Sequence, residues 1–433
     1  MKTRAWQSLV HVCRRWRTLV FGSPRRLDLK LYCSPKTPAK DRLDVWPALP
    51  LIIEGYQGSP SNNIIAALKQ SDRVRQVDLR LTTRKLKNVL APMQVPFPEL
   101  TDLELYSYGK PPAIPDLFLG GSAPRLRFLS LDSISFPGLP KLLPSTTHLV
   151  NLCLYGIPHS GYFSPQAMVA PLSVLSSLES LFLHFESPQS RPDLESQSLL
   201  PKRSVFPALA KFHFKGTTEY LEEFVTLINT PQLTQMVITF FNQIDFDCPR
   251  LAQFINCTPT LKVFDEVHVR FDDNTASVIL ESRTSKFPSD YLQINISCRG
   301  PDWQLSFIEQ VCNTSLLRLL MVEDLYIEHR CSRLVWNSDA IESTLWLQLL
   351  LPFTAVKNLY LSKEFTPGIT DALQELVGGR ITEVLPSLQN IFVERLKLSG
   401  SFHEKIGQFV SARQLSDRPI TVSDWERMAP IRS

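Results

Sequence analysis

The chain has 433 residues, of which 44% are hydrophobic and 20% charged, as expected of a folded protein with a buried core. The formal net charge of +4 is too small a surplus to indicate a nucleic-acid partner or an acidic substrate. No apolar run approaches the roughly 18 residues that cross a bilayer, so we expect no membrane association. The eight cysteines are scattered without a C-x-x-C pair, and no secretory signal is apparent, which favours the cytoplasm or the nucleus.

The first expected element is an amphipathic helix over residues 6–20. Its apolar stripe runs from Trp6 through Cys13 and Trp16 to Val20, and three arginines lie largely off the stripe. Glycine and proline at positions 22 and 24 end the helix. Such a stripe suits either a cap that seals the first repeat of a solenoid or a docking helix. The basic residues around it have no interleaved aromatic rings, which favours a solvated face over contact with nucleic acid.

One short pattern then recurs: an apolar residue, two variable residues, an apolar residue, one variable residue and a final apolar residue. Full copies begin at Val74, Leu100, Leu126, Leu149, Leu178, Leu209, Leu233, Val322, Val356 and Leu388, and weaker copies begin at Phe264 and Leu292. The last apolar positions run from Leu79 to Val393 in eleven steps, a mean period of about 28.5 residues that falls in the leucine-rich-repeat range. The last two anchors alternate along a short strand, so they share one face and the residue between them lies on the other. Because such a unit cannot bury its own apolar face, we expect the units to stack.

Helical spacing lies between the strands of the second half, over residues 221–228, 341–349 and 369–376. The predicted fold is therefore an α/β leucine-rich-repeat-like solenoid, with parallel strands on the concave face and helices and irregular segments on the convex face. We expect it to cover residues 25–415, with a hairpin inserted at 267–290. Residues 416–433 are expected to be a C-terminal tail.

The N-terminal helix also carries a family resemblance. Val-Cys-Arg-Arg-Trp-Arg at 12–17, followed by Leu19 and Ser23-Pro24, looks like the C-terminal half of an F-box. The segments at 26–31, 44–50, 352–361, 373–379 and 385–388 resemble fungal (basidiomycete-type) F-box proteins with leucine-rich repeats. The resemblance covers most of the chain and identifies residues 1–24 as a partial F-box-like helix. Nothing before Trp6 matches the Leu-Pro segment and earlier helix that open an F-box. Either the chain starts at an internal methionine, or half of the module has been lost.

The resemblance implies a non-enzymatic receptor. In that family the F-box binds a Skp-type adaptor of a cullin (SCF) ubiquitin ligase, and the repeats recruit the protein to be modified. By resemblance, the residues that support or contact the adaptor are Leu9, Val12, Cys13, Trp16 and Leu19. The alternative is a leucine-rich-repeat interaction scaffold with no link to ubiquitin.

Motifs of catalysis and ligand binding are missing from the sequence. There is no H-E-x-x-H, no G-x-x-x-x-G-K-[ST] and no G-x-S-x-G, and the histidines occur singly. We therefore expect no catalytic residues, no metal and no cofactor. The candidates for binding a partner protein are the strand residues between the last two anchors: Asp78, Glu104, Ser130, Cys153, Phe182, His213, Tyr326, Tyr360 and Phe392. Acids and aromatics on a concave wall suit protein recognition, although some of these residues could instead pack against a terminal segment.

Overall fold

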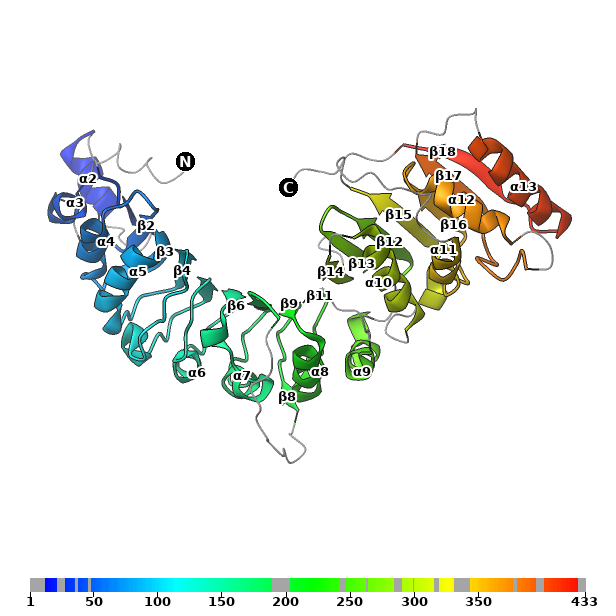
Figure 1. Cartoon of the computed structure of the whole chain (residues 1–433). Helices are drawn as coiled ribbons and strands as arrows, with labels where there is room; N and C mark the ends of the chain where they lie inside the picture. Colours follow the sequence, from blue (N-terminus) through cyan, green and yellow to red (C-terminus); the bar gives the residue numbers. More distant parts are fainter. Residues whose placement is uncertain are drawn as a thin grey trace. The chain divides into compact units, whose positions relative to one another are not determined.

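The computed structural model describes residues 12–21, 28–35, 38–45, 48–188, 203–241, 247–261, 264–283, 290–298, 300–314, 319–330, 343–376, 380–394 and 401–426, without the side chains of 20, 21, 45 and 401–405. The chain forms two compact units. Unit 1 comprises Met1–Gly216 with Leu227–Thr230, and unit 2 comprises Thr217–Thr226 with Pro231–Ser433. In each unit a sheet forms one layer and helices form the other (Figure 1).

Unit 1 alternates strands with short helices, of which those labelled η are 3-10 helices. Its elements are α2 (Arg14–Phe21), β1 (Leu29–Tyr32), α3 (Ala39–Val45), β2 (Leu51–Gly55), α4 (Ser61–Leu68), β3 (Val74–Thr82), α5 (Thr83–Leu90), η3 (Ala91–Gln94), β4 (Asp102–Tyr108), η4 (Phe118–Gly121), β5 (Phe128–Asp132), α6 (Leu139–Leu142), η5 (Leu143–Ser145), β6 (Asn151–Ile157), η6 (His159–Gly161), α7 (Pro165–Leu172), β7 (Ser180–Phe185), β8 (Ser204–Val205), β9 (Lys211–Gly216) and β10 (Ile228–Asn229). The strands lie in the order β1-β2-β3-β4-β5-β6-β7-β9, all parallel. Strands β8 and β10 form a separate parallel pair.

The repeat pattern determines the register of this sheet. Leu103 of β4 pairs with Leu129 of β5, which pairs with Leu152 of β6. All three side chains are fully buried, as are the equivalent anchors of the other repeats, so the anchors of successive repeats stack into one core. The predicted solenoid is therefore confirmed. Strands β1 and β2 belong to it as well, although they carry only the alternating anchors and no full copy of the pattern.

Unit 2 has longer helices between its strands. Its elements are α8 (Thr218–Leu227), β11 (Gln235–Phe241), α9 (Pro249–Cys257), η7 (Pro259–Leu261), β12 (Glu266–Phe271), β13 (Thr275–Glu281), β14 (Tyr291–Ser297), α10 (Pro301–Asn313), η8 (Leu319–Met321), β15 (Asp324–His329), α11 (Ser343–Leu350), β16 (Asn358–Leu361), α12 (Thr366–Gln374), β17 (Asn390–Glu394), α13 (Ser401–Leu415) and β18 (Thr421–Trp425). Helices α8, α11 and α12 confirm the three predicted helical stretches. Helices α10 to α13 pack against one another in chain order.

The strand order of unit 2 is β11-β14-β13-β12-β15-β16-β17-β18. The predicted hairpin is confirmed, because β12 pairs antiparallel with β13. The strands do not follow chain order here, since β14 pairs antiparallel with β13 and parallel with β11. Each hairpin reverses the chain direction, so the third strand of this meander again runs parallel to the solenoid strands and closes against β11. The copies at 264 and 292 therefore exchange places.

The C-terminal residues also differ from the prediction. Of the expected tail at 416–433, residues 421–425 form β18, which pairs parallel with β17, so the solenoid sheet extends past residue 415. A polar ladder ties this end together. Thr421 donates to Asn390 (2.6 Å), Asn390 to Asn358 (2.8 Å) and Asn358 to Asp324 (2.6 Å). These side chains occupy the same position on adjacent strands, so each hydrogen bond helps to fix the register.

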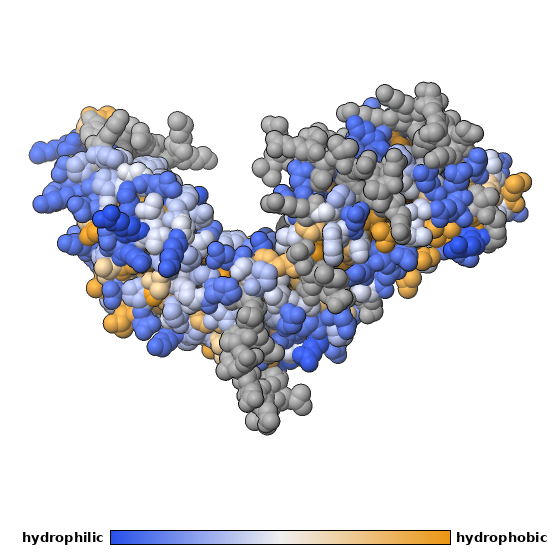
Figure 2. Space-filling model, viewed as in Figure 1, coloured by the Kyte–Doolittle hydropathy of each residue, from blue (hydrophilic) through white to orange (hydrophobic). Residues whose placement is uncertain are grey.

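The remaining surface is largely polar. Figure 2 shows hydrophilic residues over most of the visible face, with smaller hydrophobic patches between them. Among the described helices, none combines the length and the apolar character that crossing a bilayer demands.

Candidate functional site

The candidate site is the face of each sheet that the helices leave uncovered, here called the open face. In unit 1, six of the residues proposed from sequence occupy one row across adjacent strands, in the order Asp78, Glu104, Ser130, Cys153, Phe182 and His213. All are half-buried except Cys153, which is buried. Their position on the open face is confirmed, and their role in binding stays a prediction. The same row continues to Glu54 and Tyr32 on β2 and β1, which the sequence reasoning missed because those strands lack the full pattern.

The N-terminal end of this row is rich in acids and tyrosines. We call Glu54, Asp78 and Glu104, with Tyr32, Tyr56, Tyr106 and Tyr108, the acid–tyrosine strip. Arg80 reaches two of the acids, at 3.3 Å from Asp78 and 3.7 Å from Glu104. Burial, and then the charge of Asp78, raise the pKa of Glu104. The strip thus holds its negative charges close together and only partly neutralised.

The other end of the row in unit 1 is aromatic. Phe182 packs against His213 with ring centres 4.2 Å apart and planes tilted by 33°. The ring centre of Tyr155 lies 5.8 Å from that of Phe182 and 5.0 Å from that of His184. Burial is the main cause that lowers the pKa of both histidines to about 4. Both imidazoles are therefore neutral at physiological pH. The charge on this part of the open face comes from Lys211 and Lys215, which flank His213 on β9 and also contribute to the lowered pKa values.

In unit 2 the open face carries a stack of four rings. His268, Tyr326, Tyr360 and Phe392 lie in register on β12, β15, β16 and β17. Successive ring centres are 4.3, 4.2 and 4.6 Å apart, and the planes are within about 10° of parallel. This places Tyr326, Tyr360 and Phe392 on the open face, as predicted from sequence. Each ring in the stack packs against the rings on the adjacent strands, and these contacts restrain its orientation.

Trp425 of β18 packs against this stack. Its ring centre lies 5.5 Å from that of Tyr360 and 6.0 Å from that of Tyr326, tilted by 64° and 57°. The alternative left open from sequence, that some candidates pack against a terminal segment, is therefore confirmed for these two tyrosines. The Trp425 side chain therefore covers part of the open face of unit 2.

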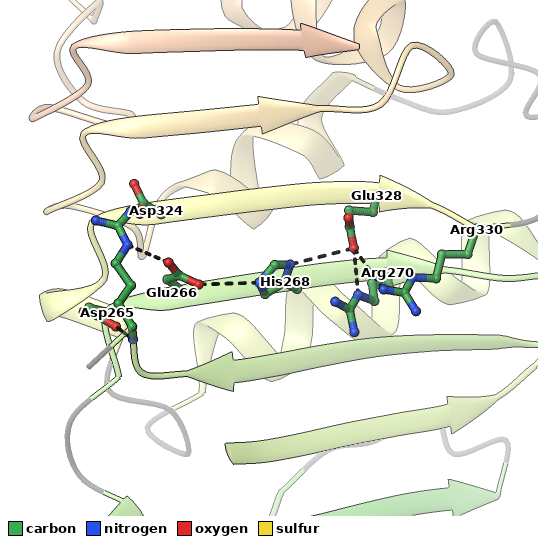
Figure 3. A network of polar contacts seen from close by, with 8 residues as sticks. Asp265, Glu266, His268, Arg270, Asp324, Glu328 and Arg330 are labelled. Atoms are coloured by element: carbon green, nitrogen blue, oxygen red, sulfur yellow. Dashed lines mark hydrogen bonds and ion pairs between the residues drawn. The ribbon is translucent and has the colours of Figure 1, made fainter. Parts of the chain in front are cut away.

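A network of charged residues adjoins the stack (Figure 3). Glu328 accepts a hydrogen bond from Arg270 Nε at 2.7 Å, and His268 Nδ1 lies 3.7 Å from the same carboxylate oxygen. On its other side, His268 Nε2 is 3.9 Å from Glu266, and Glu266 accepts a hydrogen bond from Arg283 Nε at 2.5 Å. His268 is thus held between two carboxylates, each of which also pairs with an arginine.

These contacts shift two pKa values in opposite directions. Burial alone would raise the pKa of Glu328, but His268 and Arg270 lower it to about 2. Burial alone would lower the pKa of His268, but Glu266 and Glu328 raise it above the ordinary 6.5. Both shifts favour the charged pair.

We predict that the network stabilises the chain most between pH 4.5 and 6.5, the ordinary pKa values of Glu and His. The contribution of Glu328 is present above 4.5 and is lost as the pH falls toward 2. The contribution of His268 is present below 6.5 and is lost as the pH rises through its higher folded-state pKa. Denaturant unfolding across this range measures the profile. His268→Gln should flatten the alkaline side and weaken the acid side only in part, because Arg270 still lowers the pKa of Glu328. A wild-type profile that is level on both sides would refute the prediction.

Of the predicted adaptor-binding residues, Trp16 and Leu19 lie on α2, and Val12 and Cys13 directly precede it. Val12, Cys13, Trp16 and Leu19 are exposed, and Val12, Trp16 and Leu19 keep 65%, 46% and 64% of their surface open to solvent. Leu9 lies outside the described residues. A helix that capped the first repeat would bury these side chains, so the capping interpretation is wrong for the described part of the helix.

The described residues show no site for metal chemistry, since no three His, Cys, Asp or Glu side chains among them gather to hold an ion. A cavity of about 500 Å³ between α3 and α4 is lined in part by Lys40, Asp44, Asn62 and Lys69. Its lining contains no histidine or cysteine and no pair of carboxylates. None of the candidate residues lies there.

These features define the class of the chain, an α/β leucine-rich-repeat-like solenoid. No protein-family model and no curated protein matches the sequence. Among solved structures, the structure of this chain is similar to that of the leucine-rich repeat-containing protein LegL7 from Legionella pneumophila, with a TM-score of 0.27. The two sequences are 11% identical, and the match covers 88% of this chain and 97% of that chain. A similarity at this level carries no inference, so the fold class rests on strand order and register, and the F-box resemblance stays a prediction from sequence.

Proposed function

We propose that the chain is a non-enzymatic receptor that binds a partner protein on the open face of its solenoid. The observation that supports this most is the row of half-buried acids and aromatic rings set by the register of the strands. Tyrosine and other aromatic residues on rigid strands give binding area at little entropic cost. The proposal includes no catalytic step, no cofactor and no nucleic acid.

The experiment that tests this proposal is affinity capture with the full chain. Ser130 lies in the middle of the row on β5, and its side chain is small and half-buried, so Ser130→Trp should obstruct the open face without entering the core. Ser176 lies in the exposed turn between α7 and β7, and Ser176→Trp adds the same bulk elsewhere. The proposal requires that only the first substitution removes the captured protein.

The more specific form of the proposal is a substrate-recognition subunit of an SCF ubiquitin ligase that works in the cytoplasm or nucleus. This form is supported by the F-box-like sequence at 12–24 together with the exposed apolar side chains of Trp16 and Leu19 on α2. An exposed apolar helix face suits docking into a groove or against another helix. In this form α2 binds a Skp-type adaptor, and the open face recruits the protein to be ubiquitinated.

A pull-down with purified Skp-type adaptor tests the adaptor contact. Trp16→Ala should lower the amount of bound adaptor by at least about tenfold, as expected when an aromatic anchor is lost from an interface. Trp303→Ala is the matched control, since Trp303 is also exposed, at 55% of its surface, but lies on α10. Failure of the wild-type chain to bind the adaptor would exclude the ubiquitin link and leave the interaction scaffold, which needs only the open face.

A further inference from the structure

The acid–tyrosine strip opposes the overall charge of the chain. Glu54, Asp78 and Glu104 are paired in register on β2, β3 and β4, and neighbouring strands lie about 4.8 Å apart. Like charges opposite each other destabilise a sheet. At the partly exposed positions of β1–β5, Asp102 and Asp132 add two further acids, against the three bases Lys30, Arg75 and Arg80. Arg75 pairs with Asp28, outside the strip. The chain as a whole carries +4, so this local excess of acid is a property of the strip.

The bases present leave part of that charge unmatched. Arg80 pairs with both Asp78 and Glu104. The side chain of Arg80 is 50% exposed and that of Glu104 is 43% exposed. An exposed arginine shared between two acids contributes little stability. The raised pKa of Glu104 reflects its burial and the nearby charge of Asp78. An additional cation at Glu104 would therefore relieve repulsion that the free protein retains.

The contacts of Lys30 show that an acid and a tyrosine of the strip can together hold a cationic side chain. Its ammonium forms an ion pair with Glu54 and lies 5.0 Å from the centre of the Tyr32 ring. A carboxylate beside a tyrosine ring thus already holds a cation here, through charge and a cation–π contact. Farther along the strip, Glu104 is followed on the same face by Tyr106 and Tyr108, whose ring centres are 4.5 Å apart. Tyr108 is 40% exposed, so this second acid–tyrosine pair is accessible.

We propose that the strip binds a helical segment of the partner protein that carries arginine or lysine side chains four residues apart. Side chains at that spacing on a helix are about 5–6 Å apart, close to the strand spacing that separates the acids. Each cation then contacts a carboxylate and a tyrosine ring, as Lys30 does. This inference rests on the proposed function and specifies the chemistry of the partner.

A peptide-binding measurement on the full chain tests this inference. The probe is a fluorescent alanine-based helical peptide with arginine at every fourth position, and its match has citrulline in place of arginine. We expect the arginine peptide to bind and the citrulline peptide to bind at least about tenfold more weakly, because removing a paired charge costs that much or more. Added salt should weaken only the arginine peptide.

Variants locate the binding. Asp78→Asn combined with Glu104→Gln should weaken the arginine peptide by at least about tenfold and should not lower the melting temperature, since it removes a repulsion. Glu394→Gln is the control, because Glu394 is half-buried on β17, outside the strip. The inference is wrong if the citrulline peptide binds as well as the arginine peptide, or if the double variant keeps wild-type affinity.

The two proposals fail in different ways. If the double variant still captures the partner that Ser130→Trp loses, the open face binds its partner without the strip, so the inference falls and the proposed function stands. If Ser130→Trp captures the same proteins as the wild type, the proposed function falls first.

Discussion

Replacing Phe271 with alanine should lower the free energy of unfolding by about 3–5 kcal/mol, the usual cost of removing a fully buried aromatic ring. Phe271 is the last residue of β12, and none of its surface is exposed. Its ring lies 5.0 Å from that of Phe365 and 6.4 Å from that of Trp346. Phe365 precedes α12 and Trp346 belongs to α11. The ring therefore joins the strand where the meander meets the solenoid to two helices of the other layer.

Urea unfolding followed by far-UV circular dichroism measures this effect. Phe271→Leu is the matched variant, because it keeps most of the apolar volume and should cost clearly less than alanine. Tyr108→Ala serves as the surface control, since that ring is 40% exposed on the open face. A loss below about 1 kcal/mol for the alanine variant would be typical of a surface substitution and would contradict the packing described here.

The sequence predicted the strands wherever the full pattern was present. Leu129 and Leu131 of β5 alternate with Ser130, and the structure buries the two leucines and leaves Ser130 half-buried. The burial of alternate residues follows from strand geometry alone, so one copy of the pattern suffices to predict which side chains reach the open face. All of the candidates from Asp78 to Phe392 were found on that face for this reason.

What the pattern could not predict is pairing between strands. Leu292 and Ile294 of β14 alternate in the same way as the anchors of β12, so both strands look like ordinary repeats. Their exchange of places depends on hairpin pairing through β13, which is a tertiary preference. The segment that becomes β18 has few apolar residues, because an edge strand has one neighbour and its side chains stay mostly exposed.

The side-chain contacts on the open face could not be predicted from the sequence either. Trp425 follows Tyr360 by 65 positions, and no spacing rule connects them, yet their rings meet. The histidine between two carboxylates depends likewise on the pairing of β12 with β15, which brings Arg270 opposite Glu328. Part of the acid–tyrosine strip was predicted from the sequence, because Asp78 and Glu104 were among the candidates. Glu54 was missed because its strand, β2, lacks the full pattern.

The two open faces differ in chemistry. Unit 1 offers the acid–tyrosine strip and an aromatic cluster with two lysines beside it. Unit 2 offers a ring stack that Trp425 partly covers, next to a network in which the acids are paired with arginines. A partner with basic side chains would therefore find its first contacts on unit 1. Ser130 lies in register between Glu104 and Cys153, so bulk at this position obstructs the open face of unit 1 beside the strip.

The measurement that bears most directly on the open face as a binding surface is quantitative capture with the Ser130→Trp and Ser176→Trp chains, read out by isotope-coded mass spectrometry. We predict that a protein captured by the wild type is retained by Ser176→Trp and depleted at least about tenfold by Ser130→Trp, as expected when bulk enters the centre of an interface. Circular dichroism should show both variants folded. Equal capture by the two variants would mean that the partner binds elsewhere and that the open face is not the receptor surface.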